Sequence, residues 1–414
     1  MRLKSLDVFR GIAIASMILV NNPGSWKQVY PALEHAEWHG CTPTDLVFPF
    51  FLFIVGCAMS FSLSKYTQTT TKIGIKTSKI TQTQEKPEAE KKPLPSSFFL
   101  LPSSLFLLPS SNIYWRIARR AAILFILGLL LNTSSIALDV LLNSAPIENF
   151  GKIRIMGVLQ RIGLAYFLGA IAILNLSPRH QKLLAIALLF GYWSLLTLVP
   201  LGGGYSASEL TPEGNLGGYV DRLILGSQHL YKGGPFDPEG LLSTLPAVVT
   251  VLTGYFTGEW LRVQQIKTRT SINLAICGLC CVVIGHLWGF YFPINKQLWT
   301  SSYVVFTAGW ALLLLAVCYE TIEVRGWKWG RPFEIMGLNA IFLFVASGIV
   351  ARILLKTHIG SGKSAPSTYT WIYENWFLPW AGPLNGSLAF AVTAVLFWWL
   401  ILYGMYRRGW AIKI

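Results

Sequence analysis

The residues best suited to chemistry lie in one short polar segment between the first two apolar runs of the chain. This segment brings together two imidazoles, three carboxylates and one amide: His35, His39, Glu34, Glu37, Asp45 and Asn21. A histidine has an unperturbed pKa of about 6.5, which suits a general base near neutral pH. The segment is therefore the first candidate for a catalytic site.

Two other interpretations of this segment stay open. Its aromatic residues are typical of a belt at a membrane interface, in which polar neighbours are simply hydrated. The belt residues would be Trp26, Tyr30 and Trp38. Alternatively, His35 and His39 have the i, i+4 spacing of metal ligands, and Cys41 lies close by. The metal site is the weaker interpretation, because no fourth ligand is evident and Pro43 interrupts a local helix.

An arginine within an apolar run also needs an explanation. Arg161 lies inside such a run, where an arginine costs about 2.5–3.5 kcal/mol on insertion scales. We therefore expect it to face either a carboxylate, as a structural ion pair, or an anionic ligand in a cavity. Arg352 lies nearer a helix end and can extend to the interface.

A glycine-rich segment covers residues 201–240 and includes aromatic side chains beside Asp221 and Arg222. No strand is predicted before these glycines and no Gly-Lys-Ser follows them, which argues against a nucleotide-binding loop. The pattern suits a surface for a carbohydrate or another polar acceptor, and a re-entrant loop is equally compatible with it.

The composition decides what kind of molecule must position these groups. Of the 414 residues, 53% are hydrophobic and 13% are charged, and the mean hydropathy is +0.50. A soluble domain carries about 25% charged residues. These values exclude a disordered chain, a coiled coil and an ordinary cytosolic enzyme, and they predict an all-α membrane protein that crosses the bilayer several times. The residues that give the net charge of +15 lie mostly between the apolar runs. We therefore interpret them as signals for orientation in the membrane and not as a nucleic-acid-binding surface.

Ten apolar runs are long enough to cross a bilayer, which needs about 20 helical residues. The predicted spans are 6–22, 46–64, 115–132, 155–176, 183–200, 241–261, 272–292, 300–320, 334–355 and 385–406. The first is predicted to be a retained helix and not a signal peptide, because Asn21-Asn22-Pro23-Gly24 follows it in place of a cleavage site. The sixth and eighth are the most polar.

The distribution of basic residues predicts the orientation. With the N-terminus inside, 24 of the 34 Lys and Arg residues fall in cytoplasmic segments, eight fall in outer segments and two lie within spans. The positive-inside rule therefore favours an N-in, C-in topology. The predicted location is a multi-pass membrane protein of the plasma membrane, or of the inner membrane in a bacterium.

Residues 66–112 differ from the rest of the chain. They are polar up to about residue 92 and then repeat the pattern Leu-Pro-Ser-Ser. Such a stretch cannot bury a core of its own, so we predict a disordered cytoplasmic insert, although the apolar repeat could also lie on the membrane surface. The predicted division is 1–65 for the first two spans and the outer catalytic loop, 66–112 for the insert, and 113–414 for an eight-helix acyltransferase core.

Several segments closely resemble the heparan-α-glucosaminide N-acetyltransferase family, in the same order over about 1–63 and 113–414. The segments are Ser5-Leu6-Asp7-Val8-Phe9-Arg10-Gly11, Val20-Asn21, His35-Ala36-Glu37-Trp38, Asp45-Leu46-Val47-Phe48-Pro49-Phe50, 154–163, 218–226, 236–242 and 293–303. The resemblance implies a multi-spanning enzyme that takes acetyl from cytosolic acetyl-CoA and delivers it to an amino sugar on the opposite side. The family's active histidine falls on His35 and its functional asparagine on Asn21.

Two departures from the family concern the acceptor. The animal lysosomal members carry a lumenal domain before the first of these helices, which we expect this chain to lack. His39 stands where the lysosomal members carry asparagine, and the loop between Asn21 and His35 differs in length. The resemblance therefore implies the reaction while leaving the identity of the acceptor open.

The chemistry of the residues is compatible with this assignment. His35 could remove the proton from a glucosamine ammonium group, or it could attack the thioester and carry the acetyl group. Asn21 could orient the imidazole or donate to a developing oxyanion, and Asp45 completes the expected catalytic set. The arginines expected to bind acetyl-CoA are Arg10, Arg119, Arg120 and Arg161.

The expected partners follow from the same resemblance. They are acetyl-CoA as a co-substrate, an amino-sugar or glycan acceptor and the lipid bilayer, with no nucleic acid and no metal. A homo-oligomer stays open. The alternative function is a transporter or permease for a sugar or lipid-linked substrate, which two broken helices in matching positions would favour.

Overall fold

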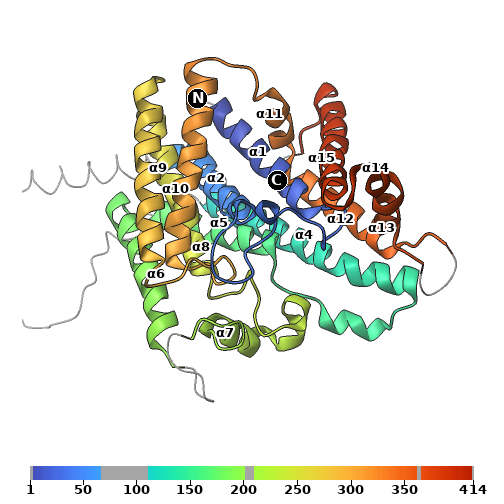
Figure 1. The fold of residues 1–414 in the computed structure, drawn as a ribbon. Helices are drawn as coiled ribbons and strands as arrows, with labels where there is room; N and C mark the ends of the chain where they lie inside the picture. The colour runs from blue at the N-terminus through green and yellow to red at the C-terminus, as the bar shows by residue number, and fades with distance from the viewer. Residues whose placement is uncertain (1–2, 67–110, 201–208, 361–364, 413–414) are drawn as a thin grey trace, which may run out of the picture.

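The structure is a computed structural model, and it describes residues 3–66, 111–200, 209–360 and 365–412. These residues form an all-α bundle, as the sequence predicts (Figure 1). The long helices are α1 (Lys4–Asn21), α2 (Val47–Ser62), α4 (Ser111–Asn143), α5 (Val158–Asn175), α6 (Pro178–Leu198), α8 (Thr244–Val263), α9 (Thr268–Trp288), α10 (Ser301–Cys318), α12 (Ala340–Lys356) and α15 (Pro383–Arg407). The shorter helices are α7 (Leu216–Leu225), α11 (Arg331–Leu338), α13 (Thr368–Ile372) and α14 (Leu378–Ala381).

Short 3-10 and π-helical segments connect or extend these helices. The 3-10 segments are η1 (Pro31–Leu33), η2 (Pro43–Leu46), η4 (Ile147–Lys152), η5 (Ser227–His229) and η6 (Tyr231–Gly233). The π-helical segments are η7 (Tyr319–Val324) and η8 (Tyr373–Phe377). The predicted insert, residues 66–112, lies almost wholly outside the described residues.

The ten predicted spans all coincide with helical segments, but fewer of them have the length and composition of a membrane span. Seven described helices meet both conditions, and an eighth is added if α11 and α12, which meet at an angle of 78°, form one broken span. The chain is therefore a multi-pass integral membrane protein, and seven to eight of the ten predicted spans meet both conditions.

The two remaining helices, α1 and α8, are more polar because other helices surround them. α1 carries Lys4, Asp7 and Arg10 within one apolar stretch, and α8 contains four threonines. Both helices are largely buried, with twelve buried residues in each. A central helix needs no apolar face toward lipid, which explains why hydropathy alone identifies these two poorly.

Close helix packing fixes the centre of the bundle. A Cβ added at Gly56 of α2 would lie 1.9 Å from the Val251 carbonyl oxygen of α8, and one added at Gly254 of α8 would lie 1.9 Å from the Phe53 carbonyl oxygen of α2. Small residues allow helices in membranes to approach this closely. The α2–α8 pair therefore supports the helix that follows the predicted catalytic loop.

The loops gather at two opposite ends of the bundle. We call one the histidine end, where Gly40 N donates to Ile294 O (2.7 Å), Trp38 Nε1 to Leu210 O (2.6 Å) and Gly24 N to Ser387 O (3.2 Å). It comprises the segments 22–46, 209–243, 289–300 and 365–385.

We call the other the arginine end. Here Arg262 donates to Ser60 O (2.9 Å), Ser271 to Glu320 (2.6 Å) and Ser5 N to Glu323 (2.9 Å). In Figure 1 the N-terminus lies at the top beside α11, and α7 lies at the bottom. Which end faces the cytoplasm stays a prediction from the charge distribution.

Candidate functional site

His35 and Asp45 form a pair at the histidine end. The His35 Nδ1 atom lies 2.7 Å from Asp45 Oδ1. Asp45 occupies the η2 turn immediately before α2, and its second oxygen accepts hydrogen bonds from Thr42 N (3.0 Å), Thr42 Oγ1 (3.1 Å) and Ala36 N (3.1 Å). The Asp45 side chain is 1% exposed, whereas that of His35 is 41% exposed. The carboxylate is thus fixed inside the protein while the imidazole is accessible.

This geometry prepares the imidazole for proton transfer. A carboxylate accepts hydrogen bonds, so the contact with Asp45 favours the imidazole proton on Nδ1. The Nε2 atom is then free to accept a proton or to act as a nucleophile, as in His–carboxylate pairs of hydrolases.

Lys296 is a third member of this cluster that the sequence did not single out as functional. Its Nζ atom lies 3.2 Å from Asp45 Oδ1 and 3.0 Å from His35 Nδ1. It belongs to the segment before α10, about 250 residues away in the sequence. The only signals for it were its place in a segment that resembles the family and its position in a predicted outer loop.

Asn21 does not join the pair. It is the last residue of α1 and is exposed, and the structure shows no hydrogen bond from it to His35 or Asp45 among the described residues. The next residue, Asn22, is buried and donates to the Ile18 carbonyl oxygen (2.8 Å). Of the three predicted catalytic residues, the fold therefore brings together His35 and Asp45.

The potential metal ligands have other partners. His39 Nδ1 lies 3.3 Å from Asn295 Nδ2, and burial lowers the pKa of His39. Burial raises the pKa of the Cys41 thiol to about 12, and the Asp45 carboxylate adds to the increase. Within the described ranges, no three His, Cys, Asp or Glu side chains are placed to hold a metal ion.

A cavity of about 420 Å³ opens at the arginine end, between α2, α4 and α5. Its lining includes Arg116, Arg119, Arg120, Tyr66 and Tyr166. The volume falls in the range of small-molecule sites, and guanidinium groups suit phosphates. Two of the four arginines predicted to bind acetyl-CoA thus lie together, and Arg116 is an addition to them.

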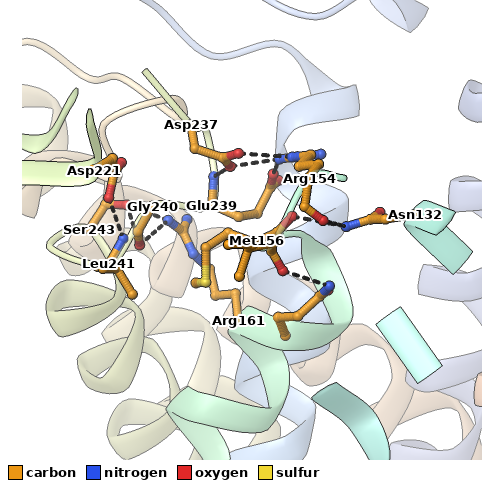
Figure 2. Close-up of polar contacts among 12 residues, drawn as sticks. Asn132, Arg154, Met156, Arg161, Asp221, Asp237, Glu239, Gly240, Leu241 and Ser243 are labelled. Atoms are coloured by element: carbon orange, nitrogen blue, oxygen red, sulfur yellow. Dashed lines mark hydrogen bonds and ion pairs between the residues drawn. The ribbon is translucent and has the colours of Figure 1, made fainter. Parts of the chain in front are cut away.

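The other two predicted cofactor-binding arginines do not line this cavity. Arg10 lies 3.3 Å from Asp7 on α1. Arg161 is fully buried and donates through Nη2 to Ser243 Oγ and to the Gly240 carbonyl oxygen (3.3 Å), as Figure 2 shows. Its guanidinium also lies 5.0 Å from the ring of Trp299, and its Nε and Nη1 groups have no hydrogen-bond partner among the residues that the structure describes. The fold therefore places Arg161 with the histidine-end loops and not with Arg119 and Arg120.

An acidic segment next to Arg161 holds the glycine-rich region in place (Figure 2). Arg154 donates to Asp237 through Nε (2.8 Å) and Nη2 (2.6 Å), and it also contacts Glu239. Asp221 of α7 accepts a hydrogen bond from Leu241 N (2.8 Å). Burial raises the pKa of the Asp221 carboxyl to about 6, and the neighbouring Asp237 adds to this increase while the Leu241 hydrogen bond opposes it.

The chain has similarity to two curated proteins, whereas no family model matches it. It is 28% identical to human heparan-alpha-glucosaminide N-acetyltransferase in an alignment 463 positions long, gaps included, which covers 98% of this chain and 59% of the human protein. It is also 28% identical to the mouse protein of that name, over 84% of this chain and 54% of the mouse protein. The chain thus spans between half and three fifths of the length of these relatives.

Proposed function

We propose that the chain is an acetyltransferase like the heparan-alpha-glucosaminide N-acetyltransferases that it resembles, and that it transfers an acetyl group from acetyl-CoA to the amine of an amino sugar. The observation that carries this proposal is the 2.7 Å contact between His35 Nδ1 and Asp45 Oδ1, which leaves Nε2 accessible at one end of a membrane protein. A glucosamine amine must lose a proton to attack a thioester, and Nε2 is suitably placed to accept it.

Catalysis in this proposal depends on His35 as the base, with Asp45 as its orienting group. The amine nitrogen attacks the acetyl carbonyl, its proton passes to Nε2, and the CoA thiolate leaves. A covalent variant has Nε2 attack the thioester first and then pass the acetyl group to the amine. Asn21 retains its proposed role only if the substrate or a movement of the α1 end brings it to the reacting atoms.

Acetyl-CoA is proposed to bind with its phosphates at the arginine end. The 420 Å³ cavity supports this placement, because Arg116, Arg119 and Arg120 surround it and Tyr66 and Tyr166 provide aromatic surfaces. The acceptor would then meet the acetyl group at the histidine end. The excess of basic residues in the predicted cytoplasmic segments supports cytoplasmic entry of acetyl-CoA.

A transporter without covalent chemistry is the second candidate, and one observation favours it. The 78° break between α11 and α12 is an interrupted helix of the kind found at transporter binding sites. However, Asn339 at this break is buried, and its side chain donates to Trp410 O (3.2 Å) and accepts from Ile412 N (2.8 Å). The C-terminal segment thus forms hydrogen bonds with the polar side chain at this break, which favours a structural role for the break.

Proteoliposomes that contain the full chain distinguish the two candidates. They are supplied with acetyl-CoA labelled in the acetyl group, on either side, together with glucosamine or glucosaminides. Acetyl transfer predicts labelled N-acetyl sugar that appears only when both substrates are present. Passage of unmodified sugar across the membrane, without labelled product from any amine, would contradict the acetyltransferase and support the transporter.

A further inference from the structure

The turn that carries Lys296 is held rigidly against the His35–Asp45 pair. Asn295 is fully buried, its backbone N–H donates to Thr300 Oγ1 (3.0 Å), and its side-chain oxygen accepts from Leu298 N (2.8 Å). Trp299 has a left-handed backbone with φ of 52°, which is unusual for a bulky residue. Such a conformation persists only where the surrounding structure enforces it.

The packing around Trp299 holds its backbone in this conformation. Its ring is 1% exposed and lies 5.0 Å from Phe48 of α2 and 5.2 Å from Tyr303 of α10. The Arg161 guanidinium stacks at 5.0 Å, and Trp299 Nε1 donates to Thr250 (3.2 Å). Tyr303 in turn donates to the Asp45 backbone oxygen (2.6 Å). The position of Lys296 is therefore built into the core.

The charges in this cluster balance in only one protonation state of the imidazole. The titratable groups that face His35 and Asp45 are the Lys296 ammonium, from the turn before α10, the Cys41 thiol, from the loop before η2, and the Tyr303 phenol of α10. A neutral His35 leaves one ammonium and one carboxylate, which cancel. An imidazolium would place a second positive charge 3.0 Å from Lys296 Nζ, at a carboxylate that already accepts from several donors.

We propose that Lys296 is a positioning residue for His35: its ammonium charge, 3.0 Å from Nδ1, keeps the imidazole neutral, so that one ring nitrogen carries no proton. Lys296 acts through Asp45 and through its own charge, and it does not itself touch the substrate. The consequence for catalysis rests on the proposed function, because a base or nucleophile needs a free Nε2. The state of the ring is a property of the resting protein and can be measured without any substrate.

The direct test is nitrogen NMR of the full chain in lipid nanodiscs, with histidine rings labelled with ¹⁵N, at one neutral pH. A His35→Gln sample identifies the His35 signals. In the wild type we expect one protonated and one unprotonated ring nitrogen. In Lys296→Met the Asp45 charge is unbalanced, so both nitrogens should be protonated, whereas Lys296→Arg should retain the neutral ring.

Two further variants control for structural damage. Lys296→Met leaves a buried carboxylate without its ion-pair partner and could destabilise the fold. The double variant Lys296→Met/Asp45→Asn removes both charges, and we expect the neutral ring to return. Lys356→Met makes the same change in a different ion pair, since Lys356 lies 2.6 Å from Asp139, and it should leave the His35 signals unchanged.

Acetyl transfer provides a second readout. Lys296→Met should lower kcat by about 10²-fold, the size of a general-base contribution, without a matching change in the KM for acetyl-CoA, and Lys296→Arg should recover part of the rate. A neutral ring with a free Nε2 in Lys296→Met would overturn the inference. A different result would refute the proposed function but not this inference: the wild type and the variants show the expected ring states, yet the wild type transfers no acetyl group.

Discussion

At the scale of single residues, Asp45 has the most demanding position in the proposed site. Its side chain is 1% exposed, and both of its oxygens are used: one by His35 and Lys296, the other by Thr42 and Ala36. A buried carboxylate is tolerated only when it is paired and hydrogen-bonded. The η2 turn, with Thr42 as its N-cap, provides one of the backbone donors that meet this requirement, and Ala36 of the preceding loop provides the other.

Asp221 provides a pH-dependent prediction at the same scale. Its carboxyl has a pKa of about 6 in the folded chain, compared with about 3.9 in an unfolded chain. A raised pKa means that the folded state binds the proton more tightly, so this contribution is fully present below about pH 4 and is lost as the pH rises through about 6. A shift of this size corresponds to about 3 kcal/mol.

The variant Asp221→Asn should remove this dependence. Thermal unfolding of both proteins in nanodiscs between pH 4 and pH 7 measures it. As the pH rises, the free energy of unfolding of the variant should increase relative to that of the wild type, by up to about 3 kcal/mol. Parallel stability curves over that interval would show that the Asp221 carboxyl does not titrate there.

The site shows which residue-level features a sequence can predict. His35 and Asp45 were predicted because a polar segment between two apolar runs is conspicuous, and because it resembles a family. Lys296 was not, since its role depends on a turn with a left-handed Trp299 that folds back from a distant part of the chain. Arg161 was predicted to need a partner, but the sequence could not show that this partner is the Gly240 carbonyl and Ser243, at the histidine end.

At the scale of helices, the α2–α8 contact determines where the proposed catalytic loop can lie. α2 begins at Val47, two residues after Asp45, and Gly56 of α2 and Gly254 of α8 let the two backbones touch. The sequence identified both segments as apolar, but period and hydropathy do not show which pairs of helices are neighbours. The same limit applies to α1 and α8, which are recognisable as helices in the sequence, whereas their burial by other helices appears only in the folded bundle.

A glycine substitution tests this contact. Gly254→Ala should lower the free energy of unfolding by about 1–3 kcal/mol, because the new methyl group would meet the Phe53 carbonyl oxygen. Gly191→Ala on α6 is the matched control, since no atom lies within 4 Å of its added Cβ, and it should be neutral or slightly stabilising. Equal melting temperatures for the two variants would contradict the close packing of α2 on α8.

At the scale of the whole molecule, the histidine end and the arginine end are separated by the bundle, as a transfer across a membrane requires. The predicted orientation places Lys232 outside and Lys267 inside, and both are exposed. Single cysteines at these positions, in a Cys41→Ser background, should react differently with an impermeant maleimide added to intact cells. Labelling at position 232 alone is the expected result, and labelling at 267 alone would reverse the topology.

The insert provides another prediction at this scale. A short Gly/Ser linker in place of residues 67–110 should leave expression and acetyl-CoA binding nearly unchanged, because the segment is polar and repetitive and is not part of the resemblance. Binding can be measured by calorimetry on the purified protein. Loss of both expression and binding would show that the segment packs on the core.

The central claim is that His35 performs the acetyl transfer, and one measurement tests it most directly. Acetyl-CoA binding and acetyl transfer to an amino sugar are measured in parallel for the wild type, His35→Ala and His39→Ala. We predict that His35→Ala binds acetyl-CoA normally, since the 420 Å³ cavity lies at the other end, but loses at least about 10²-fold in transfer. His39→Ala should retain most of its activity. Full turnover by His35→Ala, or complete loss only in His39→Ala, would contradict the assignment.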